Sequence, residues 1–463
     1  TNNPPCGAMR GFGAPQVCFA YEGQMDKLAK AVGVDPLEIR LRNAVRTGSI
    51  LPTGQSVHST APVREILEKL RDMPMPGPQP PAGGGAAAYP GGAGNVSRGE
   101  SVRRGVGYAV GFKNVAYSEG FDDSGEARIR LGAGADGPLA EIRTAAVDCG
   151  QGLLTVLTQI ARTELGFDAV QFPVADTAGV GSAGSSSASR QTVMAGGAVK
   201  MVCEVALDEL RERLASRHGA VAGGRAIGFA GGSVLLDGEA VAPTAEILDP
   251  PIERTAVYHH RPTTGFDEKG QGDIHASFVF GAERAVVEVD TELGLVRVVE
   301  IAAVQDVGRA INPAGVEAQI EGGTAMGLGL ALMERMQLSE GRILNGSFTD
   351  YHIPTSLDVP RIVSSFIEEP EPGAPYGAKG IGESATIVAT AAVVAAIRDA
   401  TGLELNRAPV RLEDVSGLTP RVSSSGWAPN PDVPWQHPIP ELAGLGLGQQ
   451  QLMREPSTRS TDC

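Results

Sequence analysis

One carboxylate stands where a proton could be transferred. Glu383 lies between Gly382 and Ser384, directly before an apolar segment rich in Ala, Val and Ile. The segment predicts a helix, and a carboxylate at a helix start is stabilised by the positive end of the helix dipole. Glu383 is therefore either a capping residue or a partly buried general base in a catalytic site.

A run of Gly, Ser and Ala over residues 181–189 is the second candidate site, and Arg190 and a strong helical pattern follow it. Backbone N–H groups, serine hydroxyls and a helix N-terminus together form a cradle for anions. Arg190 could add two parallel hydrogen bonds to a phosphate. The same composition also describes a flexible linker, and the residues alone leave both interpretations open.

Glycine-flanked amides form the third candidate. Gln151 lies between Gly150 and Gly152 before a helical segment, and Gln319 stands three residues before Gly322. Each turn could be ordinary helix-start chemistry. Several such amides at separate helix starts suit a large ligand that is held by backbone and amide groups rather than by charged side chains.

Three other patterns are interpreted as structural. The literal G-x-G-x-x-G at 132–137 is followed by Pro138 and a second strand-like run, so it predicts a hairpin turn and not a dinucleotide loop. Lys379 lacks the spacing of a phosphate-binding loop. The adjacent His259 and His260 point in different directions on any regular element, and we expect no metal-ligating cluster.

The elements that must position these residues are both helices and strands. Apolar periodicity and capping signals predict helices at 15–32, 36–42, 63–71, after Gly152, at 194–214, from Pro313, and from Ser384 to Gly402. Strand patterns occur at 105–114, 127–131 and 141–147, and a hairpin is expected over 276–298. These elements predict a mixed α/β (α+β) fold with mostly antiparallel sheets and packed helices.

Composition suggests four parts along the chain. Residues 73–100 are rich in Pro, Gly and Ala and nearly free of charge, as in a linker. They separate a small N-terminal unit, 1–72, from a main body, 101–420. Residues 421–463 form a polar, Pro-rich tail.

Charge and cysteine usage exclude several classes. The chain of 463 residues has a net charge of −15, so it lacks the basic field of a nucleic-acid binder. We find no apolar run near the ~18–20 residues of a membrane helix. The five cysteines are scattered and form no Cys-x-x-Cys pair, which disfavours zinc or iron–sulfur binding and fits a reducing cytoplasm.

Taken in order, these stretches resemble the molybdopterin-binding subunit of the xanthine dehydrogenase/oxidase family of molybdenum hydroxylases. The resemblance runs from Thr1 to about Val415, and its N-terminal stretch is most similar to actinobacterial xanthine dehydrogenases. Each stretch alone is weak evidence, but the ordered set is specific. The stretches that carry the resemblance are 8–16, 150–152, 187–190, 306–322 and 380–383.

The resemblance implies roles for individual residues. Glu383 would be the catalytic base, and Arg10 would contact the cofactor near the metal. Phe12 and Tyr117 would clamp a flat substrate, with Ser118 beside Tyr117. The residues implied in cofactor binding are Gly11, Phe12, Gly13, Gln151, Ser187, Ser189, Gln319 and Gly382.

By the same resemblance, the reaction would be hydroxylation of hypoxanthine and xanthine to urate. Glu383 would deprotonate a Mo–OH group whose oxygen attacks the substrate carbon while hydride passes to Mo=S. The molybdopterin would be the cytosine dinucleotide form. Electrons would pass through [2Fe–2S] and FAD on partner subunits to NAD⁺.

One departure from the family concerns the segment ahead of the Ala8–Gln16 motif. Complete molybdenum subunits of the family carry a long segment there, with the substrate-reading residues, so we expect a missing N-terminal molybdopterin-binding half as a further partner. Two alternatives stay open: a hydroxylase of another N-heterocycle or an aldehyde, and a non-catalytic scaffold that keeps the fold. The presence of Glu383 argues against the scaffold.

Overall fold

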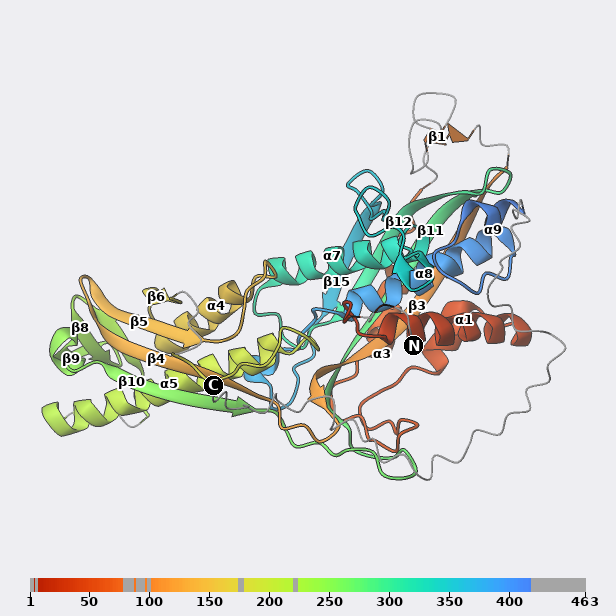
Figure 1. Ribbon diagram of the computed structural model, residues 1–463. Helices are drawn as coiled ribbons and strands as arrows, with labels where there is room; N and C mark the ends of the chain where they lie inside the picture. Colours follow the sequence, from red (N-terminus) through yellow and green to blue (C-terminus); the bar gives the residue numbers. More distant parts are fainter. Residues whose placement is uncertain are drawn as a thin grey trace, which may run out of the picture. The chain divides into compact units, whose positions relative to one another are not determined.

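A four-stranded sheet in the order β15-β12-β11-β3 organises one part of the protein (Figure 1). The computed structural model describes residues 4, 7–77, 87–88, 96–97, 101–173, 179–219 and 224–417. The strands β3 and β11 and the strands β11 and β12 pair antiparallel, whereas β12 and β15 pair in parallel. The expected hairpin is confirmed, because β11 and β12 connect at the Asp290–Gly294 turn. The strand bounds are β3 Val102–Ser118, β11 His275–Asp290, β12 Leu295–Asp306 and β15 Arg361–Ile367.

Helices cover both faces of this sheet. On one face α8 (Ser384–Thr401) packs on β3 and β11, with α7 (Pro313–Leu332) and α1 (Ala14–Val32) beside it. On the other face lie α2 (Pro36–Arg42) and α3 (Val63–Asp72). A Cβ atom added at Gly107 would lie 2.2 Å from the backbone nitrogen of Ala396, so helix α8 rests directly on strand β3.

The apolar helix α8 corrects one expectation from the sequence. Among the described residues, Ser384–Thr401 is long and apolar enough to cross a membrane, so the statement that no apolar run reaches that length is wrong. Within the protein 83% of this segment is buried. The helix is apolar all round because strands β3 and β11 and helices α1 and α7 surround it.

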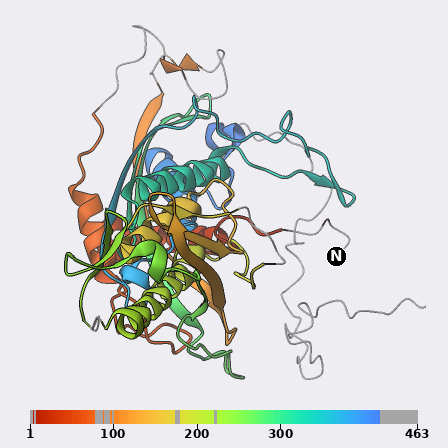
Figure 2. The same cartoon turned by 90° about the vertical axis from the view of Figure 1, so that its left-hand side faces the viewer.

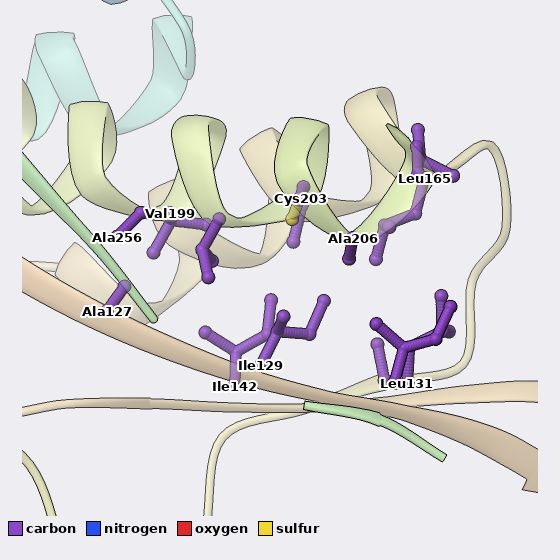
Figure 3. Packing of buried hydrophobic residues seen from close by; sticks show 14 of the residues in the cluster. Ala127, Ile129, Leu131, Ile142, Leu165, Val199, Cys203, Ala206 and Ala256 are labelled. Atoms are coloured by element: carbon purple, nitrogen blue, oxygen red, sulfur yellow. The ribbon is translucent and has the colours of Figure 1, made fainter. Parts of the chain in front are cut away.

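A second four-stranded sheet, in the order β10-β4-β5-β6, carries helices α4 and α5 on one face (Figures 1 and 2). Figure 3 shows Ile129, Leu131 and Ile142 of the sheet packing against Val199 and Cys203 of α5. The G-x-G-x-x-G pattern forms the β4–β5 hairpin, as predicted. The bounds are β4 Ser124–Gly134, β5 Gly137–Thr144, β6 Val170–Gln171, β10 Ile252–His259, α4 Leu153–Leu165 and α5 Gln191–His218.

Helix α5 is longer than the sequence pattern predicts. It begins at Gln191 rather than near Met194 and ends at His218 rather than near Leu214. Its residues from Val193 to Val199 are all buried, so an apolar stripe distinguishes only the second half of the helix. The predicted stripe is confirmed there, with Val202, Ala206, Leu210 and Leu214 in the core.

The remaining elements are short. A three-stranded sheet of β7, β8 and β9 lies beside the second sheet (Figure 1). The β13–β14 hairpin belongs to an excursion after α7 (Figure 2). The bounds are β1 Ala87–Ala88, β2 Val96–Ser97, β7 Ile227–Ala230, β8 Ser233–Leu236, β9 Glu239–Pro243, α6 Thr244–Ile247, β13 Leu338–Ser339, β14 Arg342–Ile343, η1 Pro375–Gly377 and α9 Leu412–Ser416. The mixture of helices with mostly antiparallel sheets confirms the predicted fold class.

The N-terminal helices share their core with the main body. Cys18 of α1 belongs to the same buried cluster as Val388 of α8, and Ile66 of α3 packs with Phe278 and Phe280 of β11. Packing therefore does not separate residues 7–72 from residues 101–417. The composition boundary at 73–100 lies mostly outside the described residues, and the expected tail at 421–463 lies wholly outside them.

A carboxylic acid is buried in the first sheet. The side chain of Glu283 on β11 is 0% exposed, and its Oε1 atom accepts a hydrogen bond of 2.8 Å from the Thr324 hydroxyl of α7. Burial raises the pKa of Glu283 to about 8, against an ordinary value of 4.5, and the Thr324 bond offsets only part of this. The folded protein therefore holds Glu283 in its protonated form at neutral pH.

This burial predicts a pH-dependent stability. Between about pH 4.5 and pH 8 the folded state binds a proton that the unfolded chain has released, so the free energy of unfolding should fall by a few kcal/mol as the pH rises through this window. A Glu283→Gln variant should flatten that slope, because glutamine stays neutral. Urea unfolding at several pH values measures it, with the exposed Glu317→Gln as control. An unchanged slope in Glu283→Gln would contradict the assignment.

Candidate active site

Glu383 lies where three distant segments meet. The residue is 8% exposed, and its Oε1 atom accepts a hydrogen bond of 3.1 Å from the Gly11 N–H. Its Oε2 atom accepts one of 3.0 Å from the Ser189 hydroxyl and lies 3.6 Å from the Lys113 ammonium. The side chain makes no capping bond to helix α8. Its partners come from the loop before α1, the loop before α5 and strand β3, so the capping interpretation does not describe it.

Arg10 joins the Glu383 turn to helix α7. Its Nε atom donates to the carbonyl of Gly382, and its Nη2 atom donates to the Gln319 side chain at 2.9 Å and to the Gln319 carbonyl at 3.2 Å. Burial lowers the pKa of Arg10, and the nearby charge of Glu383 opposes this. The structure thus brings together Arg10, Gln319, Gly382 and Glu383.

The backbone around Glu383 is closely packed. A Cβ atom added at Gly380 would lie 1.5 Å from the carbonyl oxygen of Ser189, so only glycine allows the two loops to touch. Ser189 itself has a φ of 50°, in the left-handed region that is costly for a residue with a side chain. The loops that carry Ser189 and Glu383 are therefore locked together.

The Gly/Ser run forms a hydroxyl-rich loop beside Tyr117. The Tyr117 hydroxyl bonds with the Ser185 hydroxyl, which lies 2.6 Å from that of Ser187. Burial raises the pKa of Tyr117, but the bonds with Ser185 and Ser187 and the charge of Arg190 outweigh it, so the pKa lies below its ordinary value. The Ser185 and Ser187 side chains are exposed and remain able to bind a ligand.

Gln151 lies near the same loop. Its Nε2 atom donates to the Val147 carbonyl at 3.0 Å, and Ser186 donates to that carbonyl at 3.3 Å. The Gln151 Oε1 atom accepts from the Cys149 N–H at 2.6 Å. The turn is fixed by Asp148, which the sequence analysis did not single out and whose carboxylate accepts bonds of 2.9 Å from Gly150 and Leu154. Both ends of the Gln151 amide thus have partners within the turn.

Arg190 corrects the expectation of a phosphate-binding side chain. It is 1% exposed and pairs with Asp123, with 2.9 Å between its Nε atom and the carboxylate. Its other N–H groups donate to Asp123 and to the carbonyls of Ala183, Ser124 and Ser185. All its hydrogen-bonding capacity is used inside the protein, so Arg190 shapes the Gly/Ser run and is not free to bind an anion.

The residues implied in substrate binding are not among the described hydrogen-bond partners of Glu383, which are Gly11 and Ser189. Phe12 is 73% exposed, next to the buried Gly11. The Tyr117 ring packs edge-on against Phe121 at 5.1 Å, and the Arg190 guanidinium lies 4.9 Å from its centroid. Ser118 ends strand β3 opposite His275. Their roles as a substrate clamp stay predictions.

Lys113 is the site residue that the sequence analysis missed. It is 8% exposed on β3, where Gly111 and Val115 on either side share the buried face of the strand. A lysine in the buried register of a strand is unusual. That break in the alternation was the signal available in the sequence.

The donors around this site suit an organic cofactor held by hydrogen bonds. The hydroxyl-bearing Ser185 and Ser187 are exposed. No group of three His, Cys, Asp or Glu side chains in the described part of the chain is placed to hold a metal ion directly.

Comparisons with known proteins place this fold and site in the class of molybdopterin-binding proteins. Two family models described as a molybdopterin cofactor-binding domain match residues 91–360 and 1–44. The chain is 32% identical over 89% of its length to the xanthine dehydrogenase molybdenum-binding subunit of Escherichia coli, covering 53% of that protein. It is 33% identical over 86% of its length to the nicotine 6-hydroxylase large subunit of Paenarthrobacter nicotinovorans, covering 49%.

A solved structure agrees as well. The aldehyde oxidoreductase from Desulfovibrio gigas matches 89% of the chain with a TM-score of 0.70 and 27% identity, and 41% of that protein is covered. The chain belongs to the xanthine dehydrogenase family of molybdenum hydroxylases, as a molybdenum-binding subunit. It spans about half the length of the curated relatives it matches.

Proposed function

We propose that this chain supplies the base-bearing part of the active site of a xanthine dehydrogenase, which hydroxylates hypoxanthine and xanthine to urate. The buried Glu383 carboxylate, held by Gly11, Ser189 and Lys113, carries this proposal. A catalytic base must be held in a fixed position within hydrogen-bond reach of the proton it accepts, and these partners hold the carboxylate in that way.

In this proposal the chain's own residues orient the substrate and accept a proton from the reaction. Glu383 accepts the proton at its carboxylate, whose two oxygens Gly11 and Ser189 hold in place. Arg10 fixes the Glu383 turn against Gln319, and the aromatic rings of Phe12 and Tyr117 orient a flat heterocycle. Positioning of this kind contributes much of the rate acceleration of enzymes.

The molybdopterin, in its cytosine dinucleotide form, would supply the metal centre that delivers oxygen and takes up two electrons. The residues that would hold it by hydrogen bonds or close backbone approach are Gly11, Phe12, Gly13, Gln151, Ser187, Ser189, Gln319 and Gly382. The exposed hydroxyls of the Gly/Ser run support this placement.

The proposed enzyme works in the cytoplasm as a complex. Partner subunits with [2Fe–2S] clusters and FAD pass the electrons to NAD⁺, and a further molybdopterin-binding half completes the substrate pocket. Relatives described as single subunits of a larger complex support the partner subunits.

A hydroxylase of another heterocycle or of an aldehyde is the second candidate. Relatives described as a nicotine 6-hydroxylase and an aldehyde oxidoreductase, 33% and 30% identical, favour it to a similar degree. Glu383 would serve as the base for each substrate, so the described residues do not distinguish them.

Dye reduction by the assembled complex separates these candidates. We expect reduction with hypoxanthine and xanthine, and little with nicotine or benzaldehyde, in preparations of measured molybdenum content. Samples without substrate give the background rate. Reduction with benzaldehyde or nicotine but not with purines would reject the xanthine dehydrogenase assignment.

A further inference from the structure

Lys113 is a buried cation beside the proposed base. Its ammonium lies 3.6 Å from Glu383 Oε2 and donates a hydrogen bond of 2.6 Å to the Asn114 side chain. Asn114 is itself held by a bond of 2.9 Å from its amide to the Ala116 carbonyl. Among the ion pairs of the described residues, Lys113 has Glu383 as its carboxylate partner. Lys113 is 8% exposed, so burying its charge costs free energy of desolvation. A buried lysine contributes little to solubility, so solubility does not account for its presence here.

The other groups around Glu383 define the local charge. Arg10, from the loop before α1, is the second cation near the carboxylate, and its guanidinium is bonded to Gln319 and Gly382. Ser189 and Gly11 contribute neutral donors. His275 on β11 is uncharged at neutral pH, because burial first and then the charges of Lys113 and Arg261 lower its pKa to about 4.

A buried carboxylate is a useful base only if it is ionised when the substrate arrives. Burial by itself favours the neutral carboxyl group, which cannot accept a proton. A cation within about 4–6 Å opposes this and favours the ionised form. Lys113 contacts the Oε2 side of the carboxylate, whereas Arg10 uses its hydrogen bonds on the backbone and on Gln319.

We propose that Lys113 is a positioning residue: its buried ammonium, 3.6 Å from Glu383 Oε2, favours the ionised carboxylate that accepts the proton. The proposal rests on the proposed function of Glu383. Lys113 acts through Glu383 and has no part in binding the substrate.

The test compares Lys113→Met and Lys113→Arg in the assembled, molybdenum-loaded complex. The measurement is kcat/KM for xanthine across the pH range, which reports the ionisation of the free enzyme. Lys113→Met should move the acid limb of the profile to higher pH by about one unit, so that its loss of activity is about tenfold greater below the limb than above it. Lys113→Arg should restore the wild-type limb. Lys200→Met, which removes a lysine on α5, is the control and should not move it.

A second readout needs no activity. Urea unfolding of the full chain as the Lys113→Met, Glu383→Gln and double variants should show coupling, with the double variant losing less stability than the sum of the single losses. Additive losses, or an acid limb of Lys113→Met that superimposes on that of the wild type at equal molybdenum content, would overturn the proposal.

The two proposals fail differently. If Glu383→Gln abolishes turnover while Lys113→Met leaves the profile unmoved, the role of Lys113 is wrong and the base stands. If Glu383→Gln stays active, the proposed function is wrong, and the role assigned to Lys113 is overturned with it.

Discussion

Replacement of Glu383 by glutamine is expected to lower turnover by about 10²–10⁴-fold while molybdenum and pterin content stay normal. Glutamine has nearly the same shape and can still accept a hydrogen bond from Gly11 or Ser189. It cannot accept the proton that the reaction releases. Steady-state dye reduction with xanthine, together with metal and pterin analysis of the same preparation, measures the effect.

The control for this experiment is Glu317→Gln, an exposed carboxylate on α7 that is not part of the site. It should turn over at the wild-type rate. Near-normal turnover of a fully loaded Glu383→Gln complex would remove Glu383 from the mechanism. Loss of the cofactor in that variant would instead assign the carboxylate to cofactor binding.

Replacement of Arg190 by methionine is expected to cost about 3–5 kcal/mol of the free energy of unfolding. The change leaves the Asp123 carboxylate, 1% exposed, without its cation. It also removes the donors that hold the carbonyls of Ala183, Ser124 and Ser185. Because these bonds shape the Gly/Ser run, we expect lower cofactor content in the assembled complex as well.

An exposed arginine gives the matched control. Arg42 pairs with Glu38 one helical turn away, with their side chains 63% and 45% exposed. Arg42→Met should cost at most about 1 kcal/mol, since solvent screens such pairs. Urea unfolding of both variants measures the difference. Equal losses would show that the buried pair does not hold the loop.

The sequence by itself determined most of the local structure. Asp35 and Pro36 predicted the start of α2, and Asp35 does accept bonds from Leu37 and Glu38. Pro138 after the glycines correctly separated a hairpin from a dinucleotide loop. These signals work because caps, turns and apolar periodicity act between residues near one another in the chain. The order of the short motifs also sufficed to identify the family.

Only the tertiary structure decided the site. The bond from Gly11 to Glu383 spans 372 positions, and that from Ser189 spans 194. Asp123 reaches Arg190 across 67 positions and turns an apparent phosphate ligand into a structural pair. A carboxylate's partners and a cation's burial depend on which distant surfaces the core brings together. The spacing of residues along the chain does not specify such long-range contacts. Glu383 could therefore be identified as a candidate from its local motif, whereas its contact with Lys113 could not be predicted.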